Sequence, residues 1–126
     1  MSEDPKRIVG RVVDEVIAGG DLSLVDELFT DGLAQRARRW FATFRASFED
    51  VRMETVQLVA EGDTVVGRFR CSGTHQGPWD GHPPTGRRFE GVDEIYFFRL
   101  EGGRIAEMWG LEDLDSRRRQ LGITST

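Results

Sequence analysis

The sequence predicts an α+β protein in which helices come first and an antiparallel sheet follows. Apolar residues recur at helical spacing up to about residue 48, and from residue 51 onward they alternate with polar ones. The alternating segments are joined by short turns, Glu61-Gly62-Asp63 and Glu101-Gly102-Gly103, of the kind that link neighbouring antiparallel strands. A block of helices followed by a block of strands is the pattern of an α+β domain.

Three helices are expected in the first block. Asp4-Pro5 predicts the start of the first helix, because a carboxylate caps a helix and proline suits its first turn. Gly19-Gly20 ends this helix, and Asp21 is a plausible cap for the second. The third is expected over residues 33–48, where the apolar stripe is interrupted by solvated arginines.

Four strands are expected in the second block, at residues 51–60, 64–76, 88–100 and 104–112. Residues 77–86 hold three of the four prolines, which predicts a constrained loop between the second and third strands. Residues 114–121 could close the chain as a short helix. A chain of 126 residues has room for one domain, residues 1–126.

Composition limits the partners. The formal charge of −5 and the pI near 5.1 give no field that attracts phosphate backbones, so we expect no nucleic-acid partner. No stretch approaches the roughly 20 apolar residues of a membrane span, and the first ten residues lack a signal-peptide core. We therefore expect no membrane partner and a cytoplasmic location. One cysteine and two distant histidines predict neither a disulfide nor a metal site.

Candidate catalytic residues lie on the third strand. Glu94, Tyr96 and Phe98 share one of its faces by the alternation of side chains. If that face lines a pocket, Glu94 could act as a base and Tyr96 as a donor to a developing enolate. The opposite face, with Ile95 and Phe97, is equally apolar, so Glu94 could also be solvated on the outside.

Other candidates come from the neighbouring strands. His75 shares a face with Phe69 and Cys71, and it could either shuttle a proton or hold the proline-rich loop in shape. One of Met108 and Trp109 must point inward. Glu112 could supply a carboxylate at the end of the last strand, or it could belong to a solvated acidic rim.

Three segments resemble the SnoaL-like polyketide cyclases, a family of ester cyclases. They are GTHQGPWDGHPPTGRRFE (residues 73–90), FFRLEGGRIAEMWGLED (97–113) and AGGDLSLVDELFT (18–30). The resemblance implies the nuclear-transport-factor-2-like fold, in which three helices and a strongly curved antiparallel sheet enclose a cone-shaped apolar pocket. It also implies aldol-type cyclisation without a cofactor, performed by an acid/base pair on an apolar, carbonyl-bearing substrate.

The resemblance also shows two departures at the family's catalytic positions. Aligning the RLEGGRI turn without gaps puts Tyr96 where the family has its histidine and Gly110 where it has its aspartate. Only Thr30-Asp31-Gly32 stand where the family inserts a short strand and loop. We therefore expect either an enzyme using Glu94, Tyr96 and His75, or a non-catalytic ligand-binding or dimerisation module.

The remaining expectations concern the pocket and the assembly. The expected pocket residues are Phe69, Trp79, Phe98, Met108, Trp109 and Glu112. A homodimer through the open sheet face is expected from Arg68 and Arg70 on one strand and the aromatic residues on both faces of the next.

Overall fold

The sheet is an antiparallel meander of four strands in the computed structural model, which describes residues 4–123. The strands are β1 (Arg52–Glu61), β2 (Thr64–Thr74), β3 (Arg88–Glu101) and β4 (Arg104–Glu112), and they pair in that order. The α+β prediction is confirmed, and each strand begins and ends within two residues of its expected place.

The helices precede the sheet, except for a short one at the end. They are α1 (Pro5–Arg11), continued by the π-helical segment η1 (Val12–Ala18); a 3₁₀ turn η2 (Leu22–Leu24) leading into α2 (Val25–Leu28); α3 (Asp31–Ser47); and α4 (Leu114–Gln120). Asp4 caps α1 by accepting from the Lys6 N–H at 2.9 Å, and Asp113 caps α4 by accepting from the Ser116 N–H at 3.0 Å.

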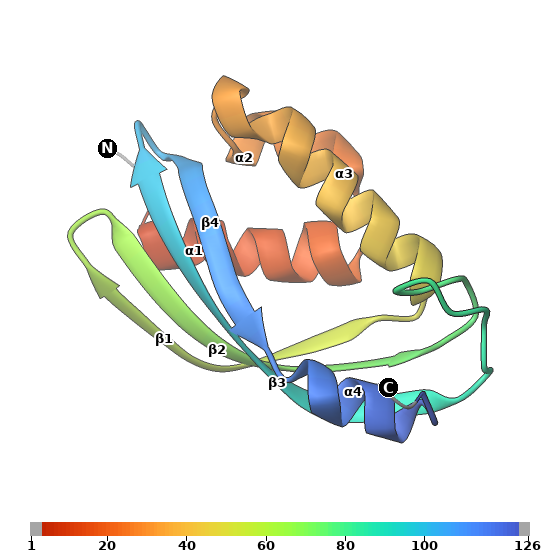
Figure 1. Ribbon diagram of the computed structural model, residues 1–126. Coiled ribbons are helices and arrows are strands. Elements are labelled where there is room, and N and C mark those ends of the chain that lie inside the picture. The colour runs from red at the N-terminus through yellow and green to blue at the C-terminus, as the bar shows by residue number, and fades with distance from the viewer. Residues whose placement is uncertain (1–3, 124–126) are drawn as a thin grey trace.

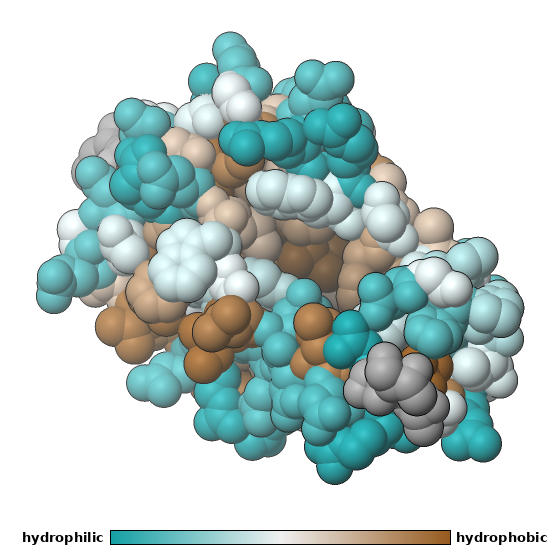
Figure 2. All heavy atoms as spheres, in the orientation of Figure 1, coloured by the Kyte–Doolittle hydropathy of each residue, from teal (hydrophilic) through white to brown (hydrophobic). Residues whose placement is uncertain are grey.

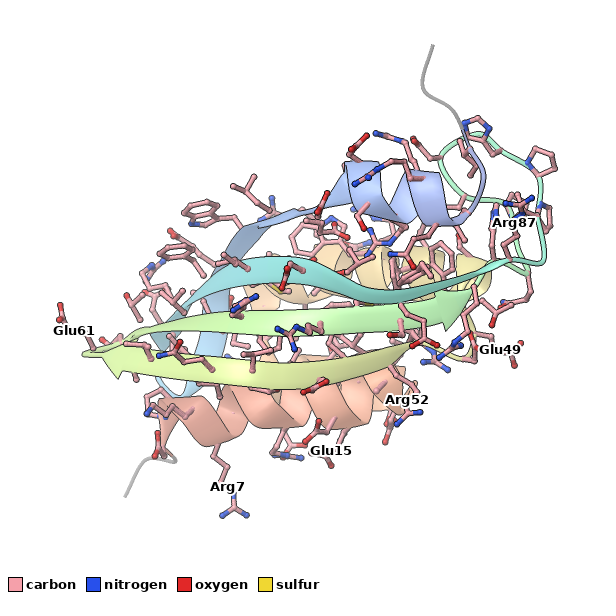
Figure 3. All side chains as sticks on the ribbon, turned by 90° about the horizontal axis from the view of Figure 1, so that it is seen from below. Arg7, Glu15, Glu49, Arg52, Glu61 and Arg87 are labelled. Carbon is pink, nitrogen blue, oxygen red and sulfur yellow. The ribbon has the colours of Figure 1, made fainter. Side chains whose placement is uncertain are left out.

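The sheet curves around the helices (Figure 1). The chain from α1 to α3 lies on its concave side, while α4 packs against β3 at the far end. The pairing of β2 with β3 shifts register between Cys71 and Gly73. Opposite this shift lies Gly91, whose φ is 62° and whose N–H donates to the Ser72 hydroxyl. Such bulges bend a strand and increase its twist. Figure 3 shows the other side of the sheet, with Arg52 and Glu61 at the two ends of β1.

The core lies between the concave face and the helices. Val65, Phe69 and Cys71 point into it from β2, as alternation predicts, and Val92 and Phe98 do so from β3. The junction between α2 and α3 is attached to the β4 edge, because the Thr30 N–H donates to the Ile105 carbonyl at 2.9 Å. This contact fixes the start of α3 beside the edge strand.

The proline-rich loop between β2 and β3 lies against the C-terminal end of α3. Strand β2 ends at Thr74, two residues earlier than expected, because the Gln76 and Gly77 N–H groups donate to the Ser47 carbonyl. A Cβ at Gly77 would lie 1.9 Å from the Ala46 carbonyl oxygen, so only glycine allows this approach. In residues 4–123, no helix is both long and apolar enough to cross a membrane.

Candidate active site

A cavity of about 550 Å³ opens between α3 and the inner faces of β3 and β4. Figure 2 shows it as a hollow with an apolar floor. Helix α3 contributes Trp40, Phe41 and Phe44, and the proline-rich loop contributes Trp79. Aromatic side chains form much of the lining, which suits a flat apolar ligand.

Glu94 brings a carboxylate to this apolar cavity. It lies on the inner face of β3 and is 3% exposed. Burial, and then the nearby charge of Glu112, raise the pKa of Glu94 to about 7. A carboxyl group with this pKa can take up or release a proton near neutral pH. The structure thus decides between the two faces of β3 that the sequence left open.

Arg117 holds Glu94 in place. Its Nη2 donates to Glu94 Oε2 at 2.5 Å, and its Nη1 donates to Glu112 Oε1 at 2.7 Å. The guanidinium is fully buried and lies 4.7 Å from the Phe89 ring centroid. Although Arg117 comes from α4, outside the sheet, it reaches the same inner end as both carboxylates.

Tyr96 follows Glu94 on the same face and also lines the cavity. Burial, together with the neighbouring carboxylates, raises the pKa of the Tyr96 phenol, so it stays protonated and can donate a hydrogen bond. Interaction with Tyr96 favours the ionised form of Glu94. A polarising donor and a base are therefore adjacent.

Gly110 leaves room for Tyr96. The two residues are cross-strand partners. A Cβ at position 110 would lie 2.1 Å from the Ile95 carbonyl oxygen and 2.4 Å from Tyr96 Cδ1. Any side chain at position 110 would therefore collide with β3, both with its backbone at Ile95 and with the Tyr96 ring.

His75, the third expected catalytic residue, is buried but does not line the cavity. Its Nδ1 accepts from the Thr85 N–H at 3.2 Å, which requires an unprotonated Nδ1. Burial, and then the charge of His82, lower the pKa of His75. The ring packs near Phe48 and Trp79, so its observed contacts hold the proline-rich loop.

The expected pocket residues divide into two groups. Trp79, Met108, Trp109 and Glu112 line the cavity. Phe69 and Phe98 are buried behind Tyr96, with ring centroids 6.2 and 6.4 Å from its ring, and do not line it. Trp109 points to the outer face, where its ring stacks on that of Phe97 with the ring centroids 4.6 Å apart. It contacts the cavity only at the rim, because β4 is the edge strand.

Arg117 was missed by the sequence reasoning. In the run Arg117-Arg118-Arg119 it looks like part of a solvated basic face, and its neighbours do pair at the surface, with Asp80 and Asp115. The available signal was the spacing of Leu114, Arg117 and Leu121, which puts Arg117 on the apolar stripe of a helix. A charge on an apolar stripe needs a buried partner.

Potential metal ligands are scattered. Within residues 4–123, no group of three or more His, Cys, Asp and Glu side chains is arranged to hold a metal ion. Cys71 is buried near Glu94, and burial raises the pKa of its thiol, which suits a packing role. The expectation that no cofactor is used stays a prediction.

The fold and the cavity define a class of protein, an α+β cone with an open, mostly apolar cavity and an ionisable carboxylate in it. A family model, SnoaL-like polyketide cyclase, matches residues 7–121. The chain belongs to the SnoaL-like polyketide cyclase family, as the resemblance of its three segments predicted.

Two curated relatives are cyclases. The chain is 35% identical over 79 residues to nogalonic acid methyl ester cyclase of Streptomyces nogalater, a match covering 62% of this chain and 58% of the relative. It is 32% identical over 74 residues to aklanonic acid methyl ester cyclase of Streptomyces peucetius, covering 59% and 50%. The matches thus span only half to three-fifths of the relatives' length.

Solved structures share the whole fold. TsrD from Streptomyces laurentii superposes with a TM-score of 0.84 at 28% identity, covering 94% of this chain and 95% of that one. A SnoaL-like polyketide cyclase from Agrobacterium tumefaciens superposes with a TM-score of 0.83 at 20% identity, covering 95% and 99%. The second likeness concerns the fold alone.

Proposed function

We propose that this protein is a cofactor-independent enzyme that acts by general acid/base chemistry on an apolar, carbonyl-bearing small molecule of polyketide type, through an aldol-type cyclisation. The observation that supports this proposal best is the carboxyl group of Glu94, with a pKa of about 7, at the inner end of an aromatic cavity. A base tuned close to neutral pH is what proton abstraction beside a carbonyl requires.

Each step has a candidate side chain. Ionised Glu94 takes a proton from the carbon next to a substrate carbonyl, and Tyr96 donates a hydrogen bond to the enolate oxygen that forms. The enolate carbon attacks a second carbonyl of the same molecule, and the proton held by Glu94 passes to the new alkoxide. No atom is gained or lost, and the aromatic walls contribute by holding the substrate folded.

His75 enters this proposal indirectly. Because it is hydrogen-bonded to Thr85 and packed near Trp79, it supports the loop that closes one side of the cavity. We assign it this positioning part, and the proton transfer itself to Glu94 and Tyr96.

The test is turnover of candidate substrates by wild type and variants. The methyl esters of nogalonic and aklanonic acid are the first two, because the curated relatives that act on them share the aligned segments. We expect Glu94→Gln to lose about 10²–10⁴-fold in rate and Tyr96→Phe about 10²–10³-fold. Glu107→Gln, an exposed carboxylate on β4 paired with Arg99, is the matched control and should keep full activity. Normal turnover by folded Glu94→Gln would refute the assignment.

A second candidate function is a non-catalytic ligand-binding module on the same fold. The observation that favours it is the pair Tyr96 and Gly110 at the two positions where the family resemblance places histidine and aspartate. This candidate predicts that flat apolar ligands quench the fluorescence of Trp79 and Trp109, which line the cavity. Binding of both methyl esters without any turnover would favour the module over the enzyme.

A homodimer is the proposed assembly. The outer face of β3 and β4 exposes Ile95, Trp109 and Leu111, the last two being 57% and 75% exposed. The same outer face also carries Arg68, which lies opposite Ile95 and pairs with Asp93, so the contact would be mixed. We expect Leu111→Lys to convert a dimer to a monomer in light scattering. A mass near 14.3 kDa for the wild type at micromolar concentration would contradict the dimer.

A further inference from the structure

Two carboxylates and one guanidinium, from three different elements, form a single connected set at the inner end of the cavity. Glu94 on β3 and Glu112 on β4 are direct cross-strand partners, and each accepts from a different nitrogen of Arg117 on α4. We infer that Glu94, Glu112 and Arg117 act as one acid/base unit, in which Arg117 is a positioning residue and Glu112 exchanges protons between Glu94 and solvent. This inference rests on the proposed function and deepens it.

Arg117 cannot itself touch the substrate. It is fully buried and does not line the cavity. Around its guanidinium are the rings of Phe44, Trp79 and Phe89, with centroids 4.7 to 5.7 Å from its central carbon. Within residues 4–123 the guanidinium donates hydrogen bonds only to the two carboxylates, and its Nε has no partner. The guanidinium therefore sets where the two carboxylates lie.

The charges of Glu94, Glu112 and Arg117 favour a state in which the two carboxylates share one bound proton. Two carboxylates directly opposite each other on neighbouring strands repel, and a single guanidinium compensates only one of their charges. With both carboxylates ionised the set carries a charge of −1, while with one proton it is neutral, and burial favours the neutral form. One carboxylate then remains a base while the other is an acid, as proton transfer in both directions requires.

Glu112 provides the route to solvent. The Glu94 side chain is 3% exposed and that of Glu112 is 31% exposed, while both contact the cavity. A proton on Glu94 can reach water by moving to Glu112, because both groups are held on the same guanidinium. Direct exchange from Glu94 would require water at the buried end.

The other groups around Glu94 are few. On its own strand, Glu94 interacts with the phenol of Tyr96. From β2, the thiol of Cys71 lies nearby, but burial keeps this thiol protonated and uncharged, so it acts on Glu94 only weakly. Arg39 and Arg45 line the cavity from α3, and Arg45 is occupied by the Ile17 and Ala18 carbonyls. Burial contributes most to the raised pKa of Glu94, the charge of Glu112 raises it further, and the charge of Arg117 lowers it.

The experiment is a titration of the glutamate carboxyl carbons by NMR in the free protein, with no substrate present. Removing Glu112 as Glu112→Gln should move the midpoint of Glu94 to lower pH, and removing the cation as Arg117→Met should move it to higher pH. A charge change within contact distance typically shifts such a midpoint by about one unit or more. Arg117→Lys keeps the charge and should restore much of the wild-type midpoint. Arg119→Met, an exposed arginine on the same helix, is the control and should leave it unchanged.

Opposite shifts in the two variants would support the unit, since a merely structural role would move neither midpoint in a defined direction. An unchanged Glu94 midpoint in Glu112→Gln would overturn it. So would an Arg117→Lys variant whose Glu94 midpoint lies at clearly higher pH than in the wild type, as if the cation had been lost. If Arg117→Met does not fold, Glu112→Gln and Arg117→Lys still decide. Because no substrate is used, failure here is distinct from failure of the proposed function, which would appear as absent turnover by the wild type.

Discussion

Glu94 should make the protein less stable as the pH rises from about 4.5 to about 7. Its pKa is raised from 4.5 to about 7 in the folded protein, so in this window the folded state holds a proton that the unfolded chain has already released. The free energy of unfolding then falls with rising pH, by at most about 1.4 kcal/mol per unit. Over the difference between the two values, 7 − 4.5, the total is roughly 2 to 4 kcal/mol.

Urea unfolding measured from about pH 4.5 to about pH 8 tests this expectation. Glu94→Gln has no carboxyl group to titrate, so the wild type should lose stability relative to this variant as the pH rises through the window and stop losing it above about 7. The slope, not the absolute difference, is diagnostic, because an amide beside Arg117 also changes a buried hydrogen bond. Glu107→Gln serves as the control and should follow the wild type. Parallel pH dependences for the wild type and Glu94→Gln would refute the reasoning.

Two further substitutions test the surroundings of the site. Gly110→Ala should lower the free energy of unfolding by about 1–3 kcal/mol, the usual range for an overpacked position, because its Cβ would lie 2.1 Å from the Ile95 carbonyl oxygen. Gly32→Ala is the control in the same urea assay, since a Cβ there meets nothing within 4 Å. His75→Ala should lower stability by about 1–3 kcal/mol, because the Thr85 N–H loses its buried acceptor, yet keep turnover within about tenfold. A loss of about 10²-fold or more in folded His75→Ala would instead restore His75 as a proton shuttle.

The strand order and most element ends could be predicted because the signals are local. Gly62 and Gly102 lie at the two hairpin turns, and the alternation along β2 placed Phe69 and Cys71 inward, as observed. The end of β2 could not be predicted, because it depends on Ser47, which lies far away in the sequence on α3.

The orientation of β3 could not be decided from the sequence alone. Its two faces are about equally apolar, and the outer one includes Phe97, which stacks on Trp109 of the next strand. Only the position of the helices on one side of the sheet makes the Glu94 face the inner one. Four of the expected pocket residues line the cavity, while Phe69 and Phe98 lie one layer further in; that the cavity binds a substrate stays a prediction.

The acid/base set needed three elements to meet. The strand pattern left Glu112 open between a carboxylate of the pocket and a solvated acidic rim. Its partner Arg117 is supplied by the helix that follows, after Asp113 caps and turns the chain. A helical spacing that puts an arginine on an apolar stripe was the only indication in the sequence.

The central claim, that Glu94 is a base acting in this cavity, is tested most directly by hydrogen exchange at carbon. A flat β-dicarbonyl compound is incubated with the protein in heavy water, and NMR follows the replacement of the proton between the carbonyls, so no natural substrate is needed. We expect the wild type to accelerate this exchange above the rate in buffer and Glu94→Gln to lose about 10²–10⁴-fold of the acceleration, with Glu107→Gln unchanged. Equal acceleration by the wild type and Glu94→Gln, or none by a wild type whose cavity is shown to bind the compound, would contradict the account.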